Sequence, residues 1–173
     1  MAAEPYIIQE NVLAGFASLL DAAEDMTEPF RAIAAHLEYV TRERFEHEVS
    51  PDGTPWIPSQ RVIEGSRRGA GTLDLTGDLR ESITSDFGRD FAAFGPETSG
   101  GAAIYAAIHQ FGGRITPKAG SGKKALNTPF GPRGAVVIPA RPYVGLSGDD
   151  RDVIRDEISK HLTPALHPKG NPA

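Results

Sequence analysis

The side chains that could carry out chemistry in this 173-residue chain are few, and His109 is the strongest candidate among them. It lies beside Gln110 and shortly before a glycine-rich loop. If the fold brought an Asp or Glu from another element next to it, His109 could act as a general base of the kind that hydrolases use. No GxSxG nucleophile motif and no obvious acid partner accompany it. A histidine at a helix end that bonds to nearby backbone is therefore the simpler interpretation.

Residues 120–124, GSGKK, are similar to the end of a phosphate-binding loop but lack two of its defining positions. The motif requires a glycine where Pro117 stands and a Ser or Thr where Lys124 stands. No two of the five histidines have the HExxH spacing, and cysteine is absent, so a metal site would need distant residues that the fold brings together. The sequence predicts no nucleotide, metal or other cofactor.

Charged residues are distributed unevenly along the chain. The net charge is −5, but residues 98–148 contain no Asp or Glu and six Lys or Arg, which leaves −11 for the remainder. The six positive residues are Arg114, Lys118, Lys123, Lys124, Arg133 and Arg141. Polar loops commonly collect lysine, so the segment is either a solvated loop or a surface that binds a partner.

Composition favours one soluble domain. A hydrophobic content of 39% is enough for one core. No apolar run approaches the roughly 20 residues that a membrane helix needs, and the first ten residues lack the basic segment of an export signal. We therefore expect a soluble, unexported protein with a single domain at residues 1–163 and a flexible tail at 164–173.

Two patterned pieces flank an unpatterned one between residues 104 and 146. Tyr105, Ile108 and Phe111 recur at helical spacing, and Gly112 then predicts the end of a helix. Residues 136–138 are apolar and β-branched, which predicts a buried strand that the following prolines end. Residues 114–134 hold four glycines and three prolines, so we expect a long exposed loop that a partner orders.

The rest of the chain predicts further helices and short strands around one core. Apolar periodicity predicts helices near residues 13–23 and 27–48, a short one at 76–82 that Thr76 caps with Leu75, Leu79 and Ile83 inward, and a last one that Ser147 caps and Pro164 ends. Strands are expected at 6–9 and, as a hairpin around Gly88, at 84–86 and 90–94. The expected class is α+β, with one small, mostly antiparallel sheet and about four helices.

A second exposed loop is expected at residues 50–72. Three prolines and one glycine forbid regular structure between residues 50 and 59. Trp56, the only tryptophan of the chain, lies among them. A tryptophan in such a loop more often anchors it on the core than stacks on a ligand. We therefore expect Trp56 to be structural.

Five short motifs occur in an order that resembles the phage virion morphogenesis family of tailed bacteriophages, Mu-like neck proteins also described as tail completion proteins. They are RERF at 42–45, PDGTPW at 51–56, LTGDLRESI at 75–83, HQFGG at 109–113 and IPARPYVGLS at 138–147. Together they span most of the chain, and their order is more specific than any one motif. The motif residues that the resemblance marks as structural are Trp56, Thr76, Gly77, Leu79, Ser82, His109, Gln110, Phe111, Gly112, Arg141 and Pro142.

The resemblance implies a structural virion protein rather than an enzyme. It implies a homo-oligomeric ring of six copies at the phage neck, assembled in the host cytoplasm, that completes the tail or joins it to the head. Neighbouring neck, head-connector or tail proteins would be its partners, packaged DNA would pass through the ring, and no membrane would be involved. The alternatives are a hydrolase that uses His109 and a DNA-binding module that uses the basic residues between 114 and 141.

Two expectations concern the arginines and lysines. Arg141 should hold the chain against the end of the preceding helix, because its planar fork can bond several free helix carbonyls. The basic residues of the long loop are expected to dock on a neighbouring protein rather than line a DNA channel, where strong phosphate binding would slow passage of DNA. They are Arg114, Lys118, Lys123, Lys124 and Arg133.

Overall fold

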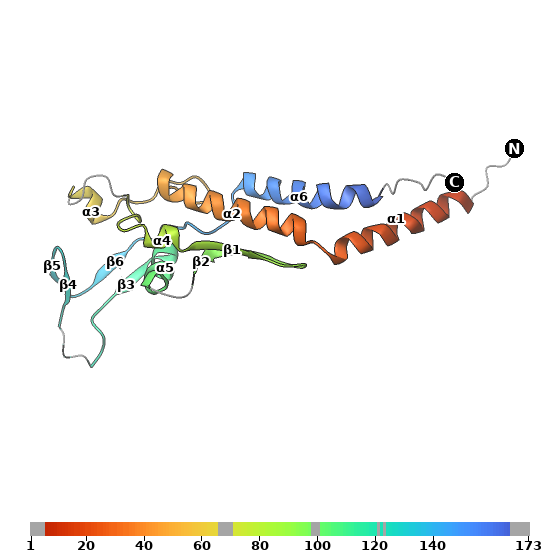
Figure 1. Cartoon of the computed structure of the whole chain (residues 1–173). Helices are drawn as coiled ribbons and strands as arrows, with labels where there is room; N and C mark the ends of the chain where they lie inside the picture. The colour runs from red at the N-terminus through yellow and green to blue at the C-terminus, as the bar shows by residue number, and fades with distance from the viewer. Residues whose placement is uncertain (1–5, 66–70, 98–100, 121, 123, 167–173) are drawn as a thin grey trace. The chain divides into compact units, whose positions relative to one another are not determined.

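The computed structural model describes residues 6–65, 71–97, 101–120, 122 and 124–166, and within them the chain is α+β, as predicted (Figure 1). The helices are α1 (Tyr6–Glu24), α2 (Thr27–His47), α3 (Gln60–Ile63), α4 (Asp78–Glu81), α5 (Gly101–Phe111) and α6 (Gly148–Leu166). The strands are β1 (Ile83–Phe87), β2 (Ala92–Pro96), β3 (Gly113–Ile115), β4 (Leu126–Thr128), β5 (Gly131–Arg133) and β6 (Val136–Ile138). None of the helices within these ranges is apolar enough over a sufficient length to cross a membrane.

In the described part of the chain the strands form three separate two-stranded sheets, β1–β2, β3–β6 and β4–β5, so the prediction of one shared sheet is wrong. Strand β6 pairs antiparallel with β3, and Gly113 lies opposite Ile138. Both β3 and the β4–β5 hairpin fall within or beside the predicted loop at 114–134. They were missed because strands of three residues that contain glycine, proline and arginine carry little β propensity of their own. Strand β3 is ordered by pairing with β6, and β4 and β5 are ordered by pairing with each other.

The chain divides into two compact units. Unit 1 comprises Met1–Tyr39, Ser85–Phe94 and Gly148–Ala173, and unit 2 comprises Val40–Thr84 and Gly95–Ser147. Helix α2 and the β1–β2 hairpin each contribute residues to both units. The five sequence motifs that carry the family resemblance all lie in unit 2.

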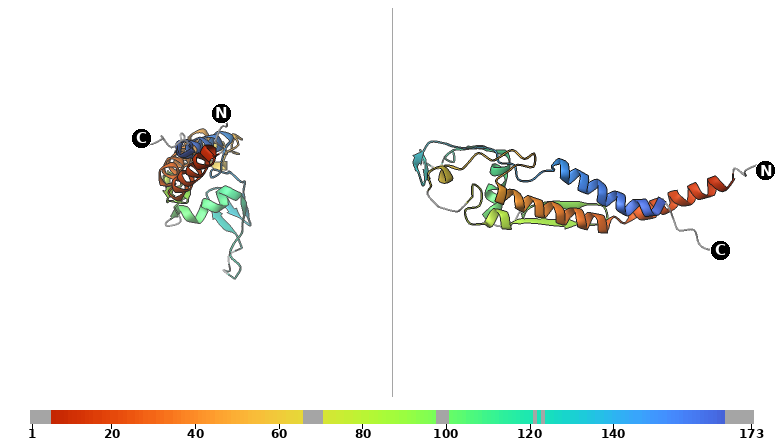
Figure 2. Two further views of the ribbon diagram at one scale, coloured as in Figure 1. Left: turned by 90° about the vertical axis from the view of Figure 1, so that its right-hand side faces the viewer. Right: turned by 90° about the horizontal axis from the view of Figure 1, so that it is seen from above.

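In unit 1, helices α1 and α6 lie side by side and run in opposite directions (Figure 2). His161 Nε2 lies 3.0 Å from Ala22 O, while the last turn of α6 approaches Gly15 of α1. Residues 6–9 are the first turn of α1, so the strand predicted there is wrong. The helical repeat that continues into α1 outweighs the β propensity of the Tyr-Ile-Ile run.

The apolar side of α1 faces solvent along much of the helix. Leu13, Phe16 and Leu20 are 64%, 59% and 67% exposed, and Val12 is also exposed. The predicted amphipathic helix is therefore present, but its apolar residues are not part of a core. We call Val12, Leu13, Phe16 and Leu20 the α1 stripe.

The core of unit 2 gathers residues from α2, α4, the start of β1, α5 and two loops. Phe45 lies at its centre, with ring centroids 5.5 Å from Trp56 and 5.3 Å from Tyr143. The other buried members are Leu79, Ile83 and Ala106. Trp56 thus fixes the proline-rich loop at 50–59 to the end of α2, which positions the residues that follow it.

Three local predictions are corrected. The N-cap of α4 is Gly77, at φ +87° and with no side-chain cap, rather than Thr76. Leu75 is exposed rather than inward. Helix α6 continues through Pro164, which lies close enough to the helix end that the lost N–H removes little of the hydrogen-bond ladder.

Two other predicted elements are the loop at 50–72 and the hairpin around Gly88. The expected loop at 50–72 contains one helical turn, α3, whose N-cap Ser59 accepts a hydrogen bond from Val62 N. The hairpin around Gly88 is confirmed, since Gly88 N donates to Phe91 O at 2.9 Å. The tail at 167–173 and Lys123 lie outside the described residues.

Candidate functional site

The segment that leaves β6, residues 139–146, is held by side chains from three other parts of unit 2. Gln110, in the last turn of α5, donates from Nε2 to Val144 O at 2.8 Å and accepts from Tyr143 N and Val144 N at 3.0 and 3.1 Å. The Tyr143 hydroxyl donates to Ala106 O at 3.1 Å, and burial raises the pKa of Tyr143 to about 12. The HQFGG and IPARPYVGL motifs are therefore in direct contact.

Two more motifs join the same segment from the other side. Trp56 Nε1 donates to Pro142 O at 2.9 Å. Arg44 Nη1 donates to Tyr143 O at 3.0 Å and to Gly145 O at 2.9 Å, and Arg44 is buried. Three distant stretches of sequence, around Arg44, Trp56 and Gln110, thus satisfy the consecutive carbonyls of residues 142–145. The extended segment at 139–146, which we call the strap, has no sheet partner among the described residues.

Gly112 lets α5 end against the strap. Its φ is +70°, and a Cβ at this position would lie 2.7 Å from Ala140 N and 3.0 Å from Ile138 O. A side chain is therefore disfavoured both by backbone conformation and by space. Phe111, the residue before it, is 79% exposed and contributes no side chain to the core.

The LTGDLRESI motif contains the short helix α4 and lies apart from the strap. Gly77 caps α4, Leu79 is buried in the core, and Ser82 Oγ donates to Leu79 O at 2.7 Å. Thr76 is exposed. These residues shape the start of β1 and do not face the cavity described next.

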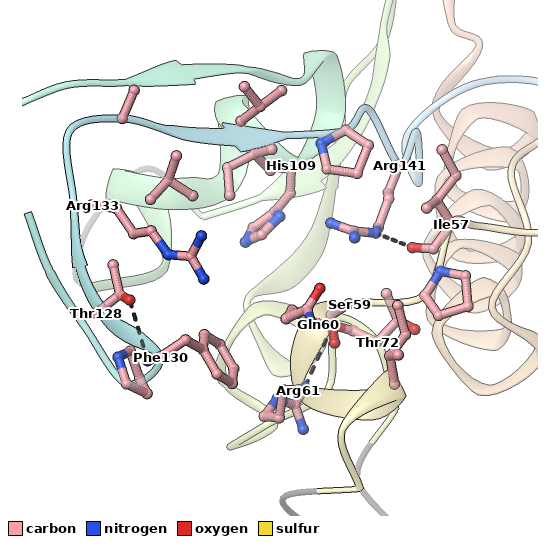
Figure 3. A pocket seen from close by; sticks show the side chains of 18 of the residues that line it. Ile57, Ser59, Gln60, Arg61, Thr72, His109, Thr128, Phe130, Arg133 and Arg141 are labelled. Carbon is pink, nitrogen blue, oxygen red and sulfur yellow. Dashed lines mark hydrogen bonds between the residues drawn. The ribbon is translucent and has the colours of Figure 1, made fainter.

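Beside the strap lies a cavity of about 720 Å³ within unit 2. Its walls come from α3, from β6 and from the β4–β5 hairpin, and the side chains of His109 and Arg141 point into it (Figure 3). The apolar part of its lining includes Ile57, Phe130, Val136 and Ile138. We call it the basic cavity because of the charged groups that it contains.

Arginine 141 is 4% exposed, yet it does not hold the carbonyls that the sequence led us to expect. Its backbone N donates to His109 O at 2.8 Å, while its side-chain Nε donates to Ile57 O at 2.6 Å. The expected bonds from the Arg141 guanidinium to the end of α5 are therefore absent from the described structure. The loop that Trp56 anchors brings Ile57 nearer to the guanidinium than the helix end.

His109 and Arg61 add donors to the same wall. Arg61 Nη2 donates to Gly71 O at 2.7 Å, and its Nη1 is buried with no hydrogen-bond partner among the described residues. His109 Nδ1 is likewise buried without a partner in the described part of unit 2. Burial lowers the pKa of His109 below its ordinary value of 6.5, and the charge of Arg141 lowers it further.

Of the basic loop residues that the structure describes, which exclude Lys123, only Arg133 lines the cavity. Arg114, Lys118 and Lys124 are exposed elsewhere on residues 114–124. Sequence reasoning missed Arg61 and Ile57 as partners of this site, because neither lies in a recognisable motif. Arg44 lies within RERF, and its burial could have been suspected from its place on the apolar side of α2.

The chemistry available to the basic cavity is recognition of an anion. None of its lining residues is Asp, Glu or Cys, so His109 has no carboxylate there to orient it as a catalytic base. Within the described ranges, no cluster of three His, Asp or Glu is placed to hold a metal ion. Three arginines and a half-buried histidine instead create a positive site with apolar walls.

Comparisons with known proteins agree with the order of the motifs. Residues 8–163 match the phage virion morphogenesis family. The chain is 38% identical over 147 residues to the "Putative capsid assembly protein G" of Escherichia phage Mu, covering 79% of each protein. It is 30% identical over 153 residues to "Mu-like prophage FluMu G protein 2" of Haemophilus influenzae, covering 88% of this chain and 90% of that one. No solved structure matches it significantly. The chain therefore belongs to the phage virion morphogenesis family.

Proposed function

We propose that this protein is a structural component of the neck of a tailed phage, where a homo-oligomeric ring, six copies in our proposal, completes the tail or joins it to the head. The observation that carries the proposal is the family match over residues 8–163. The name of the phage Mu relative refers to capsid assembly, which supports a role in building the particle. Assembly would take place in the host cytoplasm.

Surface properties support association with other subunits. The α1 stripe exposes four large apolar side chains along one helix, and contiguous apolar surface of this kind commonly marks a protein contact. Phe111 and Val137 of unit 2 are also more than 70% exposed. A subunit that becomes buried in an assembly accounts for such surfaces better than a protein that acts alone.

The basic loop is proposed to dock on an adjoining neck or tail protein. Arg114, Lys118 and Lys124 are exposed and carry no acidic neighbour in sequence. In a ring that DNA traverses, a wall of many phosphate-binding cations would retard the DNA, since each neutralised phosphate releases counterions and the attraction sums over subunits. Charge-complementary docking along the ring axis avoids this difficulty.

A hydrolase that uses His109 has less support. The cavity that contains His109 is lined by no carboxylate, and lowering of the histidine pKa by burial and by Arg141 leaves the ring neutral at pH 7. A neutral ring could accept a proton, but nothing in the lining orients it toward a nucleophile. We therefore assign no catalytic role to this chain.

Two experiments test the proposed function. Size-exclusion chromatography with light scattering on the purified full chain should give a ring-sized mass, and electron cryo-microscopy of virions should place the chain at the neck. A protein that stays monomeric and is absent from purified virions would contradict the proposal.

A pair of substitutions tests the docking role of the basic loop. Lys123→Glu with Lys124→Glu should leave rings intact but prevent head-tail joining. Joined particles that release DNA at an altered rate would instead assign the loop to the DNA channel.

A further inference from the structure

The basic cavity contains an arginine that is buried but not fully paired. Arg141 is 4% exposed, and its Nε bonds to Ile57 O. Its two Nη groups have no hydrogen-bond or ion-pair partner in the described part of the chain. Two atoms of other residues that line the cavity, Arg61 Nη1 and His109 Nδ1, are fully buried and have no partner among the described residues. Buried polar atoms of this kind are unfavourable until a partner completes them. The cavity is therefore an incomplete site.

The neighbouring groups reinforce the need for an anion. Arg61 and Arg133 bring two more positive charges to the cavity wall. Glu48 lies near enough to favour the charged form of Arg141. Its carboxylate, however, accepts from the N–H and hydroxyl of Thr72 and does not line the cavity. Carboxylates and phosphates are the anions whose geometry fits a planar guanidinium fork in two-point contact.

The walls of the cavity distinguish between these two anions. Ile57, Phe130 and Val136 line the same space as the arginines, and Ile57 is 59% exposed. A DNA phosphate is flanked by polar sugar and would leave these walls uncovered. A protein segment with large apolar side chains beside an acid would cover the walls and neutralise the arginines together.

Unit 1 of the same chain has this combination. Its segments contain 14 Asp or Glu and 6 Lys or Arg, a charge of −8, whereas unit 2 contains 9 and 12, a charge of +3. Glu24 is exposed and follows Leu20 by one helical turn, so it continues the α1 stripe with a carboxylate. Phe87, an exposed aromatic residue of unit 1 beside Asp86, is already in contact with a cation, because the Arg31 guanidinium lies 5.2 Å from its ring centroid.

We propose that the basic cavity of one copy receives the Glu24 end of the α1 stripe of a second copy. The cavity and the stripe are different surfaces, so each copy offers one donor and one acceptor. Contacts of this kind are heterologous, and repeated in one direction they close into a ring when the rotation permits. The inference rests on the proposed ring and names the residues that join its subunits.

The test uses surface variants that should not disturb folding. Arg133→Glu changes the exposed edge of the cavity, and Glu24→Lys changes the tip of the stripe. Arg114→Glu and Asp156→Lys are the matched controls, because each makes the same charge change at an exposed residue of the same unit, outside the cavity and the stripe. Masses are measured by light scattering over a concentration series, with circular dichroism to establish that each variant is folded.

We expect each site variant alone to raise the dissociation constant of the assembly about tenfold or more, and both controls to assemble as the wild type does. A mixture of Arg133→Glu and Glu24→Lys should associate at concentrations at which neither variant does alone, because the intact stripe of the first meets the intact cavity of the second and the two reversed charges also complement each other. Rings formed normally by either site variant, or a mixture that stays monomeric, would overturn the inference while leaving the ring proposal standing. A wild-type chain that is monomeric at every concentration would overturn both.

Discussion

Gln110 and Val144 are joined by a reciprocal pair of hydrogen bonds, from Gln110 Nε2 to Val144 O at 2.8 Å and from Val144 N to Gln110 Oε1 at 3.1 Å. The side-chain amide thereby does for the strap what a neighbouring strand would do. Only an amide supplies a donor and an acceptor in this planar arrangement. The pair links residues 34 positions apart and ties the end of α5 to the strap.

Replacing Gln110 with Glu should destabilise the protein by about 1–3 kcal/mol at pH 7, because the donor to Val144 O is replaced by a charged acceptor in a partly buried position. Chemical denaturation followed by circular dichroism measures the loss. Gln60→Glu is the control, since Gln60 bonds Glu64 on the exposed side of α3 and should change stability by less than about 0.5 kcal/mol. Equal effects at both positions would show that the strap does not depend on the amide.

Gly112→Ala should destabilise more than an alanine at another left-handed glycine. Strain at positive φ amounts to about 1–3 kcal/mol for a residue with a Cβ, and at Gly112 the Cβ would also lie 2.7 Å from Ala140 N. Gly65, at φ +63° with nothing within 4 Å of a built Cβ, isolates the backbone term. Thermal unfolding of the two variants separates strain from steric overlap. A Gly112 variant no less stable than the Gly65 variant would mean that the strap moves away freely.

Trp56→Phe should lower stability by about 0.5–1.5 kcal/mol, the net value of one hydrogen bond. Phenylalanine keeps an aromatic ring beside Phe45 but cannot donate to Pro142 O as the indole does. Because the chain has one tryptophan, intrinsic fluorescence of the wild type also reports unfolding of unit 2 alone. Urea titrations of both proteins by circular dichroism provide the comparison, and identical midpoints would exclude a role for the indole N–H.

His109 should make the protein less stable in mild acid. Its pKa is lowered in the folded state, chiefly by burial and then by Arg141, so the unfolded chain binds the proton more readily. The resulting stability is fully present above the ordinary pKa of 6.5 and is lost as pH falls from there through the lower folded value. Unfolding free energies measured between pH 7.5 and 5 should fall more steeply for the wild type than for His109→Gln. Parallel profiles would show that His109 is solvated in the folded protein.

Local sequence determined the elements whose patterns were long or sharply ended. The apolar repeat of residues 30–45 is enough to define α2, because its buried residues, including Ile33 and Leu37, recur at helical spacing. Gly112 ends α5 as expected, at a positive φ that a glycine adopts without strain. The same local chemistry defined the hairpin around Gly88. The order of five short motifs likewise predicted the family that the comparisons show.

Tertiary structure decided where side chains found their partners. The pairing of β3 with β6 joins segments separated by about twenty residues of weak pattern, and no local propensity selects that register. Arg141 bonds Ile57 O rather than the end of α5, because Trp56 fixes the intervening loop from a core that only the fold assembles. Tertiary structure also decided that the α1 stripe is exposed. Helical periodicity shows which residues share a face, but burial of that face depends on what packs against it.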